Sequence, residues 1–363
     1  MRVLAIDVGT GTQDVLLFDT EAELENCVQM ILPSPTRIVE REVRAATAAG
    51  AGVHLTGVTM GGGPCSWALA DHLRRGLPVS ATPDAARTLD DDLDRVAALG
   101  VQVLGEGSVA PDGYREIVLR DYDHDAIAAA LAPFGVTLDV DFLAVAVFDH
   151  GAAPSGYSDR AFRFDYLAQT VVQNDLAAFA YLREEIPPRL TRMAAVAATA
   201  PAGTPLLVMD TAPAAVLGAL DDPRLRAAKT AIVANLGNMH TLAFSLADGR
   251  PIALFEHHTG ELTRERLEAY LRQLASGSIT NAAVFADKGH GALVREAPLG
   301  QPEIVGIVGP RRRLLAGSAL APHFVVPHGD MMLTGCFGLL RALARKRPDL
   351  APAIDAALDR ADT

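Results

Sequence analysis

The first residues that could perform chemistry lie in a short polar segment near the start of the chain. The segment reads Asp7-Val8-Gly9-Thr10-Gly11-Thr12-Gln13-Asp14. It separates two predicted apolar strands, at residues 3–7 and 15–18. A tight turn of this composition presents backbone N–H groups and hydroxyls that suit phosphate oxygens, and a carboxylate at a strand end suits a phosphate-bound Mg²⁺. Because a strand and not a helix follows the glycines, the segment is not a dinucleotide-binding fingerprint. A plain glycine-rich turn capped by an aspartate is the alternative interpretation.

A second turn of related composition lies in the C-terminal half of the chain, between predicted strands at residues 230–234 and 240–246. It reads Asn235-Leu236-Gly237-Asn238-Met239-His240-Thr241. The second turn favours the functional interpretation, because two such tips can face each other across one cleft. The predicted phosphate-binding residues are therefore Asp7, Gly9, Thr10, Gly11, Thr12 and Gln13 from the first turn, and Asn235, Gly237 and Asn238 from the second.

One further acid stands where a strand meets a helix. Asp210 ends an apolar run at residues 205–210 and precedes a helix start with Pro213 in its first turn,. General-base catalysis requires a positioned carboxylate beside the acceptor hydroxyl, so we predict that Asp210 is the catalytic base and, with Asp7, a ligand of the metal. An aspartate at a helix start is also a common N-cap, and both roles are compatible.

Two more polar clusters follow strand ends. Asp149 and His150 come after the apolar run at residues 142–148, where loops of α/β proteins often bind ligands,. We predict that they contact the substrate, with a solvated loop as the alternative. His257 and His258 with Glu261 could suggest a metal site, but a strand end before a helix start is the favoured interpretation.

The elements that must position these residues occur twice in the same order. From residue 3 the chain shows strand, Asp-x-Gly loop, strand, strand, helix and a strand at residues 53–60 that ends in glycines. From residue 230 the order returns with an Asn-x-Gly loop, and its last strand lies at residues 303–308. We interpret this as an internal structural repeat, with residues 186–204 as a connector. Coincidence among common hairpins is the alternative.

Composition and charge limit the possible partners and compartments. The 363 residues carry 44 Asp and Glu against 32 Lys and Arg, a formal net charge of −12, which repels polyanions and argues against nucleic acid. Half of the residues are hydrophobic, as in globular proteins,. No apolar run approaches the ~20 residues of a membrane span, and an acid at position 7 comes too early for a signal peptide. We therefore expect a cytoplasmic protein without a membrane partner.

The order of the motifs resembles the actin/sugar-kinase/heat-shock ATPase superfamily, and most of all the FGGY carbohydrate kinases. Residues 7–12 resemble the first phosphate motif of these kinases and residues 235–238 the second. Residues 306–309 resemble the strand of the adenosine motif, and residues 333–338 the late helix that closes the nucleotide pocket. Residues 210–218 resemble the segment that carries the catalytic base. The match runs in order over most of the chain.

This resemblance implies an α/β protein with the actin-like ATPase fold, in which two RNase H-like domains with duplicated βββαβαβα units flank a nucleotide cleft. The domains would span residues 1–225 and 226–363. The resemblance implies ATP and Mg²⁺ as cofactors, with Gly309 and Gly335 at the nucleotide. The implied substrate side consists of Gly61, Gly62, Gly63 and Asp84, and the strand-end residues Asp149 and His150 are expected beside it.

The leading hypothesis is a small-molecule kinase that transfers the ATP γ-phosphoryl group to a hydroxyl of a carbohydrate or polyol. Asp14 stands where these kinases usually carry Arg or Lys, and Met209 and Thr211 replace the Gly and Asn around the catalytic acid. Asp14, Asn235 and the short chain favour, as the alternative, an ATP-dependent regulator or activator of a partner protein without kinase activity. A third hypothesis is a degenerate fold that binds a metabolite without ATP. None of the three lysines lies in a phosphate motif, so we expect strict metal dependence.

The pattern is also similar to a little-characterised bacterial and archaeal family labelled pyruvate formate-lyase activating-enzyme-like. That label implies radical-SAM chemistry, whose iron–sulfur cluster is held by closely spaced cysteines in a CxxxCxxC motif. Cys27, Cys65 and Cys336 lie far apart in the sequence. We therefore predict that radical-SAM chemistry does not apply to this chain.

Overall fold

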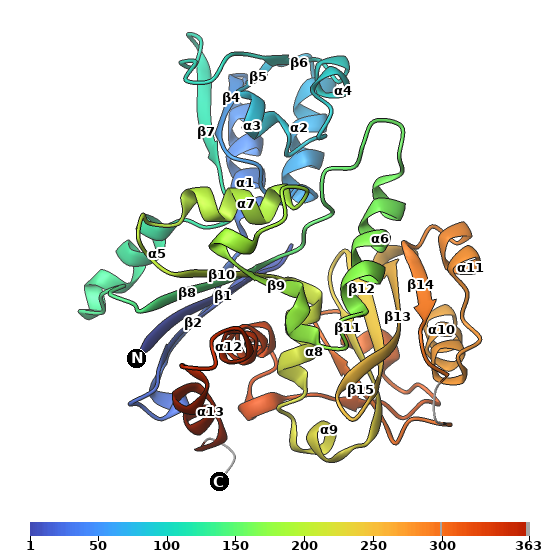
Figure 1. Ribbon diagram of the computed structural model, residues 1–363. Coiled ribbons are helices and arrows are strands. Elements are labelled where there is room, and N and C mark those ends of the chain that lie inside the picture. Colours follow the sequence, from blue (N-terminus) through green and yellow to red (C-terminus); the bar gives the residue numbers. More distant parts are fainter. Residues whose placement is uncertain (298–299, 361–363) are drawn as a thin grey trace.

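The first of three β-sheets contains the N-terminal hairpin. The computed structural model describes residues 1–297 and 300–360 (Figure 1). The first sheet has the strand order β3-β2-β1-β8-β10-β9. Its strands are β1 (Arg2–Val8), β2 (Thr12–Asp19), β3 (Val28–Pro33), β8 (Phe142–Val147), β9 (Ala180–Leu182) and β10 (Leu206–Asp210). Strands β1 to β3 are antiparallel, whereas β8 and β10 run parallel to β1. Strand β8 is apolar throughout because every one of its residues is buried,.

The second sheet repeats this topology, with the order β14-β13-β12-β11-β15-β16. Its strands are β11 (Thr230–Leu236), β12 (His240–Ala247), β13 (Arg250–His258), β14 (Gly291–Val294), β15 (Ile304–Val308) and β16 (His323–Phe324). Strands β11 to β13 are antiparallel, and β15 and β16 run parallel to β11. Each sheet has one additional edge strand, β9 in the first sheet and β14 in the second. If the other five strands of each sheet are numbered in chain order, they lie in the order 3-2-1-4-5 of an RNase H-like domain. The predicted duplication is confirmed, and the chain has the actin-like ATPase fold.

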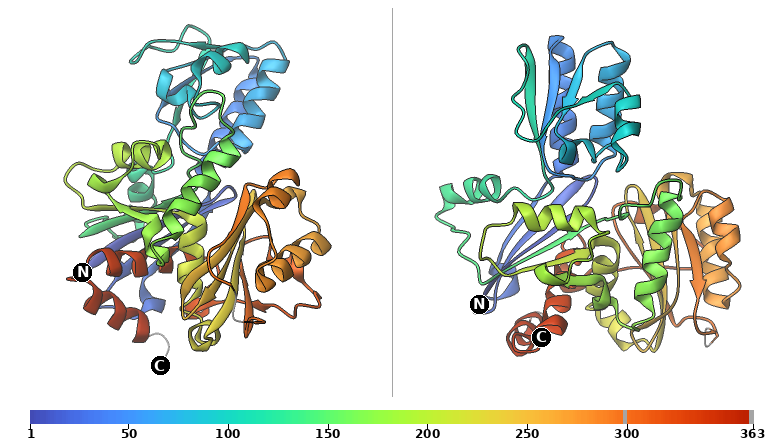
Figure 2. Two further views of the ribbon diagram at one scale, coloured as in Figure 1. Left: turned by 45° about the vertical axis from the view of Figure 1, so that its right-hand side comes forward. Right: turned by 45° about the horizontal axis from the view of Figure 1, so that its top comes forward.

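A third sheet, with the order β6-β5-β4-β7, is inserted between β3 and β8. Its strands are β4 (Gly52–Gly57), β5 (Val79–Ala81), β6 (Val101–Val103) and β7 (Tyr114–Leu119). It lies at the end of the molecule opposite both termini (Figure 1, Figure 2). The strand predicted at residues 53–60 is β4, so its assignment to the repeat was wrong. In the first sheet, the strand that corresponds to β15 is β8, which pairs with β1. The sequence did not reveal this, because an apolar run indicates that a strand is buried but not which strand lies beside it.

Thirteen α-helices are assigned in the described part of the chain. They are α1 (Pro35–Ala49), α2 (Pro64–Arg74), α3 (Pro83–Ala86), α4 (Leu93–Ala98), α5 (His124–Leu131), α6 (Asp159–Val171), α7 (Thr191–Thr199), α8 (Thr211–Ala219), α9 (Pro223–Ala227), α10 (Arg264–Ser276), α11 (Asn281–Ala286), α12 (Thr334–Lys346) and α13 (Ala351–Arg360). Helix α7 lies inside the segment predicted as a connector, so that prediction was incomplete. An alanine-rich segment has good helix propensity even beside prolines.

Helices α8 and α12 join the two large sheets. Helix α12 follows the second sheet in sequence but packs against β1 and β8 of the first, while α8 also contacts β11 and β12. The two helices cross at glycines, since a Cβ atom on Gly338 would lie 1.8 Å from the carbonyl oxygen of Ala214 and one on Gly218 would lie 1.9 Å from that of Thr334. This backbone contact determines how the two sheets meet. The domain boundary near residue 225 stays a prediction.

Buried apolar residues form one large and two smaller clusters. The large cluster fills the first sheet, α8 and α12 and continues onto one face of the second sheet. The smaller ones lie between the second sheet and α10 and within the third sheet. None of the described helices is both long and apolar enough to cross a membrane.

Candidate active site

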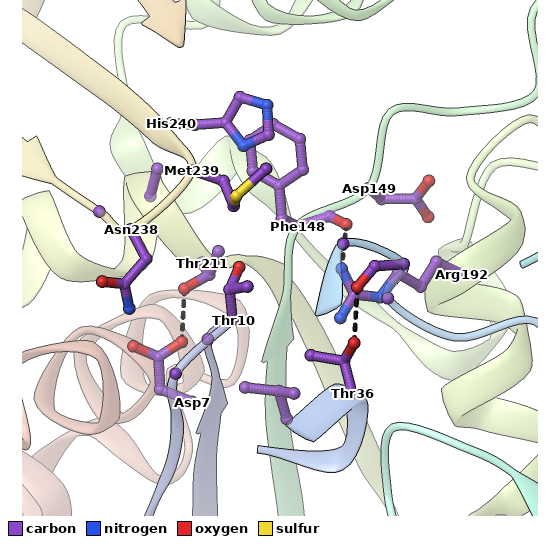
Figure 3. A pocket seen from close by; sticks show the side chains of 18 of the residues that line it. Asp7, Thr10, Thr36, Phe148, Asp149, Arg192, Thr211, Asn238, Met239 and His240 are labelled. Carbon is purple, nitrogen blue, oxygen red and sulfur yellow. Dashed lines mark hydrogen bonds between the residues drawn. The ribbon is translucent and has the colours of Figure 1, made fainter. Parts of the chain in front are cut away.

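A cavity of about 440 Å³ lies where the first two sheets meet. It is lined by the β1–β2 turn, the β11–β12 turn, the loop after β8 and the start of α12 (Figure 3). Pockets of ~300–1,000 Å³ are typical of small-molecule and cofactor sites. The predicted residues found in its lining are Asp7, Gly9, Thr10, Gly11, Thr12, Gly61, Gly62, Gly63, Asp149, His150, Asn235, Gly237, Asn238, Gly309 and Gly335. Their roles stay predictions, but the fold brings them to one place.

The two predicted phosphate turns face each other across this cavity. Each is closed by a glycine, because Gly9 and Gly237 donate their N–H groups to the carbonyl oxygen three residues on, both at 2.9 Å. The turns approach so closely that a Cβ atom on Gly11 would lie 2.7 Å from Nδ2 of Asn238. Glycine at position 11 is therefore required by the approach of the two halves of the molecule.

Asp7 lies one residue before the end of β1, lines the cavity and accepts a hydrogen bond from the hydroxyl of Thr211 (Figure 3). Helix α12 begins directly beside it, and a Cβ atom on Gly335 would lie 2.0 Å from Oδ2 of Asp7. Burial raises the pKa of Asp7 to about 7, against the effect of the Thr211 hydrogen bond, and the charge of Asp210 adds to the rise. A bound cation would restore the ionised form of this carboxylate.

Asp14 places a second carboxylate on the same cavity. Its Oδ1 atom has no hydrogen-bond partner among the described residues. Burial raises the pKa of Asp14 to about 8, and the charge of Asp7 contributes. Neither Asp7 nor Asp14 forms an ion pair with Lys, Arg or His within residues 1–297 and 300–360. The two acids therefore lack a counter-charge from the described part of the chain.

Arg192 organises the opposite side of the cavity. Its guanidinium pairs with Asp121, with Nη2 2.9 Å from Oδ1, and donates to the carbonyl oxygen of Phe148 at 2.6 Å. The N–H of Gly61 donates to the same Asp121 oxygen at 3.2 Å, and a Cβ atom on Gly61 would lie 2.4 Å from Arg192 Nη2. Arg192 thus connects the third sheet, which carries Asp121 after β7, to the first sheet.

Asp149 follows β8 and takes two backbone hydrogen bonds. Its Oδ1 accepts from the N–H of Gly151 at 2.8 Å and its Oδ2 from the N–H of Met193 at 2.9 Å. Burial nevertheless raises the pKa of Asp149 to about 6. A carboxyl whose pKa lies near the operating pH is suited to general-base chemistry.

Asp210 lies outside the cavity lining, although it was predicted as the catalytic base and as a metal ligand. Its carboxylate is fully buried and pairs with both terminal nitrogens of Arg163, with Nη2 3.1 Å from Oδ1. The other side of Arg163 pairs with Glu256 of the second sheet, with Nη2 2.9 Å from Oε1. Asp210 also accepts from the N–H of Ala212 at 3.3 Å, so the alternative role as N-cap of α8 is confirmed. Proton transfer to Asp210 would require the Arg163 pair to open.

A family model covers most of the chain. The model described as "Putative pyruvate format-lyase activating enzyme (DUF1786)" matches residues 60–314.

The chain belongs to this family.

The match begins in the third sheet and ends after β15, so it contains the second phosphate turn, the Arg163 pair and the Arg192 pair. The family resemblance seen in the sequence is thereby confirmed. No curated protein matches the chain.

Among solved structures the chain is similar to sugar kinases at low identity. One of them is "Crystal Structure of ROK Hexokinase from Thermus thermophilus", with 12% identity and a TM-score of 0.30. Another is "Lmo2764 protein, a putative N-acetylmannosamine kinase, from Listeria monocytogenes", with 10% identity and a TM-score of 0.35. Both matches cover 96% of this chain and 100% of the other. The strand order of the two sheets, and not these loose superpositions, carries the fold assignment.

Two other predicted residues also lie outside the cavity lining. Gln13 belongs to β2, is buried and donates to the carbonyl oxygen of Pro33 at 3.0 Å. Asp84 lies at the start of α3 with its side chain 58% exposed, and it accepts from Arg87 at 2.7 Å. Alternation along β2 could have placed Gln13, because successive strand residues point to opposite faces.

His257 and His258 end β13 shortly before α10 begins, as the favoured interpretation predicted, and within the described residues they do not group with Glu261 as metal ligands. Nε2 of His257 lies 3.5 Å from Asp287, and Glu261 pairs with Lys288 at 3.1 Å. On the cavity wall, His240 stacks on the ring of Phe148 with a centroid distance of 4.0 Å (Figure 3). Burial lowers the pKa of His240, and nearby histidines lower it further, so its imidazole is neutral at pH 7.

Arg163, Arg192 and Glu256 are the site residues that sequence reasoning missed. Each lies in a helix or strand with no motif around it, and each has partners distant in the sequence. Arg192 stands in a segment rich in Ala and Pro, where an arginine without a motif around it does not indicate a site. Arg163 lies in α6. Because an arginine is usually exposed, the sequence did not indicate that this one is buried,.

Proposed function

We propose that this chain binds ATP together with Mg²⁺ in the cavity and transfers the γ-phosphoryl group to a hydroxyl of a small molecule. The contact between the two turns carries the proposal, because Gly11 leaves room for Asn238 at the cavity that Asp7 lines. A phosphate chain between the turns would accept hydrogen bonds from N–H groups and hydroxyls of both halves of the molecule. The fold repeats one unit on each side of the ligand, which suits a nucleotide held between them.

The acids of the cavity fit Mg²⁺. Carboxylate oxygens are ligands that Mg²⁺ prefers, and Asp14 offers an oxygen without a hydrogen-bond partner among the described residues. Asp7 and Asp14 would hold the ion, which would supply charge neutralisation at the phosphates. The arginines in the lining, Arg87 and Arg192, are each paired with an aspartate. Since these guanidinium groups are already paired, nucleotide binding should depend on the divalent ion.

The acceptor would lie beside the loop of Gly61 to Gly63, where the lining is rich in hydroxyl and charged groups. The lining on this side includes Thr36, Thr59, Ser66, Arg87, Thr88 and Asp91. Such a surface suits a carbohydrate or polyol, which offers many hydroxyls for hydrogen bonding. Asp149 is among the residues that line the cavity and would take the proton from the acceptor hydroxyl as the phosphoryl group moves in line. Asp210, the base expected from the sequence, is the alternative that the experiment below separates.

A second candidate is an ATP-dependent regulator of a partner protein without kinase activity. Asp14 favours it, because a carboxylate in the phosphate end of the cavity replaces the cation that would stabilise a transferring phosphoryl group. The family description also names an activating enzyme. This candidate predicts nucleotide binding without acceptor phosphorylation.

The first experiment measures ATP binding by isothermal titration calorimetry, with Mg²⁺ and again with EDTA. We expect binding with Mg²⁺ and its loss in EDTA. Binding that is equal in both would contradict the Mg²⁺ role, and no binding in either would contradict both candidates. A panel of polyols and sugars with radiolabelled ATP then tests transfer. Phosphorylation of a panel member supports the kinase, whereas binding without transfer supports the regulator.

The second experiment compares Asp149→Asn with Asp210→Asn. If Asp149 is the base, Asp149→Asn loses turnover by at least about 100-fold, in the range typical of general-base removal, and keeps ATP binding. Its melting temperature should fall somewhat, because the amide can accept only one of the two backbone hydrogen bonds that the carboxylate accepts, so turnover is compared on folded protein. Asp210→Asn should lower the melting temperature because it breaks a buried ion pair. Asp112→Asn, which removes an exposed carboxylate between β6 and β7, is the matched control. A folded Asp210→Asn variant without turnover, beside an active Asp149→Asn variant, would assign the base to Asp210.

A further inference from the structure

Four histidine rings gather beside the cavity, and two of them, His150 and His240, line it. The four are His150 in the loop after β8, His240 at the start of β12, His258 at the end of β13 and His290 just before β14. Ring centroids lie 5.4 Å apart for His150 and His240, 5.1 Å for His240 and His290, and 6.0 Å for His150 and His290. The first sheet contributes one ring and the second sheet three, so the cluster spans the two halves of the molecule.

Three of these rings present ligand atoms to a common point. One imidazole nitrogen from each of His150, His240 and His290 lies within 4.8 Å of the other two. In a tetrahedral Zn²⁺ site, Zn–N bonds of about 2.1 Å place nitrogens about 3.4 Å apart. Rotations that move each nitrogen by about an ångström would therefore close the three rings onto one ion.

The buried nitrogens of this cluster lack other partners. Nε2 of His240 and both ring nitrogens of His290 make no hydrogen bond within the described residues. His290 is 1% exposed, and its backbone N–H donates to the carbonyl oxygen of Glu256 at 2.9 Å, so the sheet register holds it in place. Buried polar atoms are nearly always paired. Several orphaned nitrogens at one point indicate a missing partner that accepts lone pairs, which is what a metal ion does.

Tight turns hold two of the rings in place. His290 lies between Gly289 and Gly291, where a Cβ atom would lie 2.5 Å from a side-chain carbon of Val284 or 2.3 Å from Oδ1 of Asn281, respectively. His150 precedes Gly151, whose φ is +74°. The backbone beside both histidines is therefore constrained, by close packing at His290 and by a left-handed glycine after His150.

The charges behind the cluster also fit a cation. Nδ1 of His290 lies 3.8 Å from Oε2 of Glu256. Glu256 and Asp210 share the single guanidinium of Arg163, and all three are fully buried. When both acids are ionised, this group carries one excess negative charge in the interior. A metal-bound histidine commonly has a carboxylate behind it, which orients the ring and strengthens the bond.

We propose that His150, His240 and His290 bind one divalent transition-metal ion of the Zn²⁺ class, with Glu256 as the carboxylate behind His290. Imidazole ligands select Zn²⁺ and similar ions, whereas the Mg²⁺ proposed at Asp7 prefers oxygen. Three protein ligands leave a coordination position open. His150 and His240 line the cavity, so this position faces it and takes a water or substrate oxygen. The site is independent of the proposed kinase activity.

The test titrates tag-free, EDTA-treated full-length protein with Co²⁺, followed by competition with Zn²⁺. We expect one Co²⁺ per chain, with the visible absorption of a low-coordinate cobalt site, and its displacement by Zn²⁺. His150→Ala and His290→Ala should each weaken Co²⁺ binding by more than about 100-fold, because even loss of a carboxylate behind a ligand costs about 10–100-fold. Glu256→Gln should fall in that smaller range.

Two variants and one control keep the result interpretable. His150 is exposed and lies in a loop, so His150→Ala carries the test if His290→Ala fails to fold. His124→Ala, whose ring contacts Tyr122 away from the cavity, is the matched control and should bind Co²⁺ as the wild type does. Asp7→Asn should also keep Co²⁺ binding, which separates this site from the Mg²⁺ site. Absence of Co²⁺ binding in the wild type, or unchanged affinity in His150→Ala, would overturn the proposal.

Discussion

Two groups of buried carboxylates lie close together at the centre of the molecule, and they differ in one respect. Asp210 and Glu256 hold Arg163 between them, with all three side chains fully buried. Asp7 and Asp14 line the cavity and have no such cation within the described chain. Burial acts to lower the pKa of Arg163, but the two carboxylates outweigh it and raise that pKa. For Asp7 and Asp14 burial dominates, and it raises their pKa to about 7 and about 8.

The difference separates a structural group from a binding group. The Arg163 group, which consists of Arg163, Asp210 and Glu256, contains its own counter-charge and joins α6, β10 and β13. Its function is therefore to hold the two large sheets together. The Asp7 group, which consists of Asp7 and Asp14, lacks a counter-charge until a cation binds from solution. A carboxylate at a strand end can belong to either group, and only its partner decides which. The predictions below test this distinction, from the largest expected effect to the smallest.

Replacing Arg163 with Met should have the largest effect on stability. The substitution leaves Asp210 and Glu256 buried without their cation, and breaking a buried pair in this way costs about 3–5 kcal/mol. Urea unfolding followed by circular dichroism measures the change. Arg347→Met, which breaks an exposed pair with Asp349, is the control and should cost less than about 1 kcal/mol. If the two substitutions lowered the free energy of unfolding equally, this result would contradict a structural role of the Arg163 group.

Asp7→Asn should instead affect binding. The variant loses a charged ligand for Mg²⁺, and interactions with a charged group contribute about 1.5–3 kcal/mol, so ATP–Mg²⁺ affinity should fall by about 10- to 100-fold. Stability should be unchanged or higher, because an unpaired buried carboxylate is removed. Calorimetry with ATP and a parallel thermal melt check both expectations. A large loss of stability without a change in affinity would place Asp7 in the structural group.

The pH dependence of stability should come from the Asp7 group. The pKa values of Asp7 and Asp14 lie above the ordinary 3.8, so the folded protein keeps protons that the unfolded chain has released. Their contribution is fully present below about pH 4, and the free energy of unfolding falls as the pH rises towards about 8. Mg²⁺ favours the ionised carboxylates, so its stabilising effect should grow over the same window.

Melting temperatures from pH 5 to pH 9, with and without Mg²⁺, measure this dependence. Asp14→Asn should flatten the curve of the Mg²⁺-free protein and reduce the effect of the ion at high pH. The exposed Asp112→Asn control should leave both curves as in the wild type. An Asp14→Asn curve as steep as that of the wild type would assign the pH dependence to other groups.

The features that the sequence predicted correctly are local. Both turns and their flanking strands follow from glycines between alternating or apolar runs, and the N-cap at Asp210 follows from its position. Features set by distant partners were missed. The sheet that contains β4 depends on its pairing with β5 and β7, and the state of Asp210 depends on Arg163, 47 residues away. No spacing in the sequence indicates either partner, because these contacts form only when the sheets assemble.

The smallest effect is expected for a substitution of Asp84. Its carboxylate is 58% exposed and pairs with Arg87 at 2.7 Å, so it belongs to neither buried group. Asp84→Ala should change the free energy of unfolding by less than about 0.5 kcal/mol, as for other exposed pairs. The acceptor KM should change by less than about twofold, since 1.4 kcal/mol corresponds to a factor of ten. Arg87, its partner, does line the cavity. A tenfold rise in KM would therefore mean that the third sheet moves when substrate binds and brings Asp84 to the acceptor, as the sequence resemblance implied.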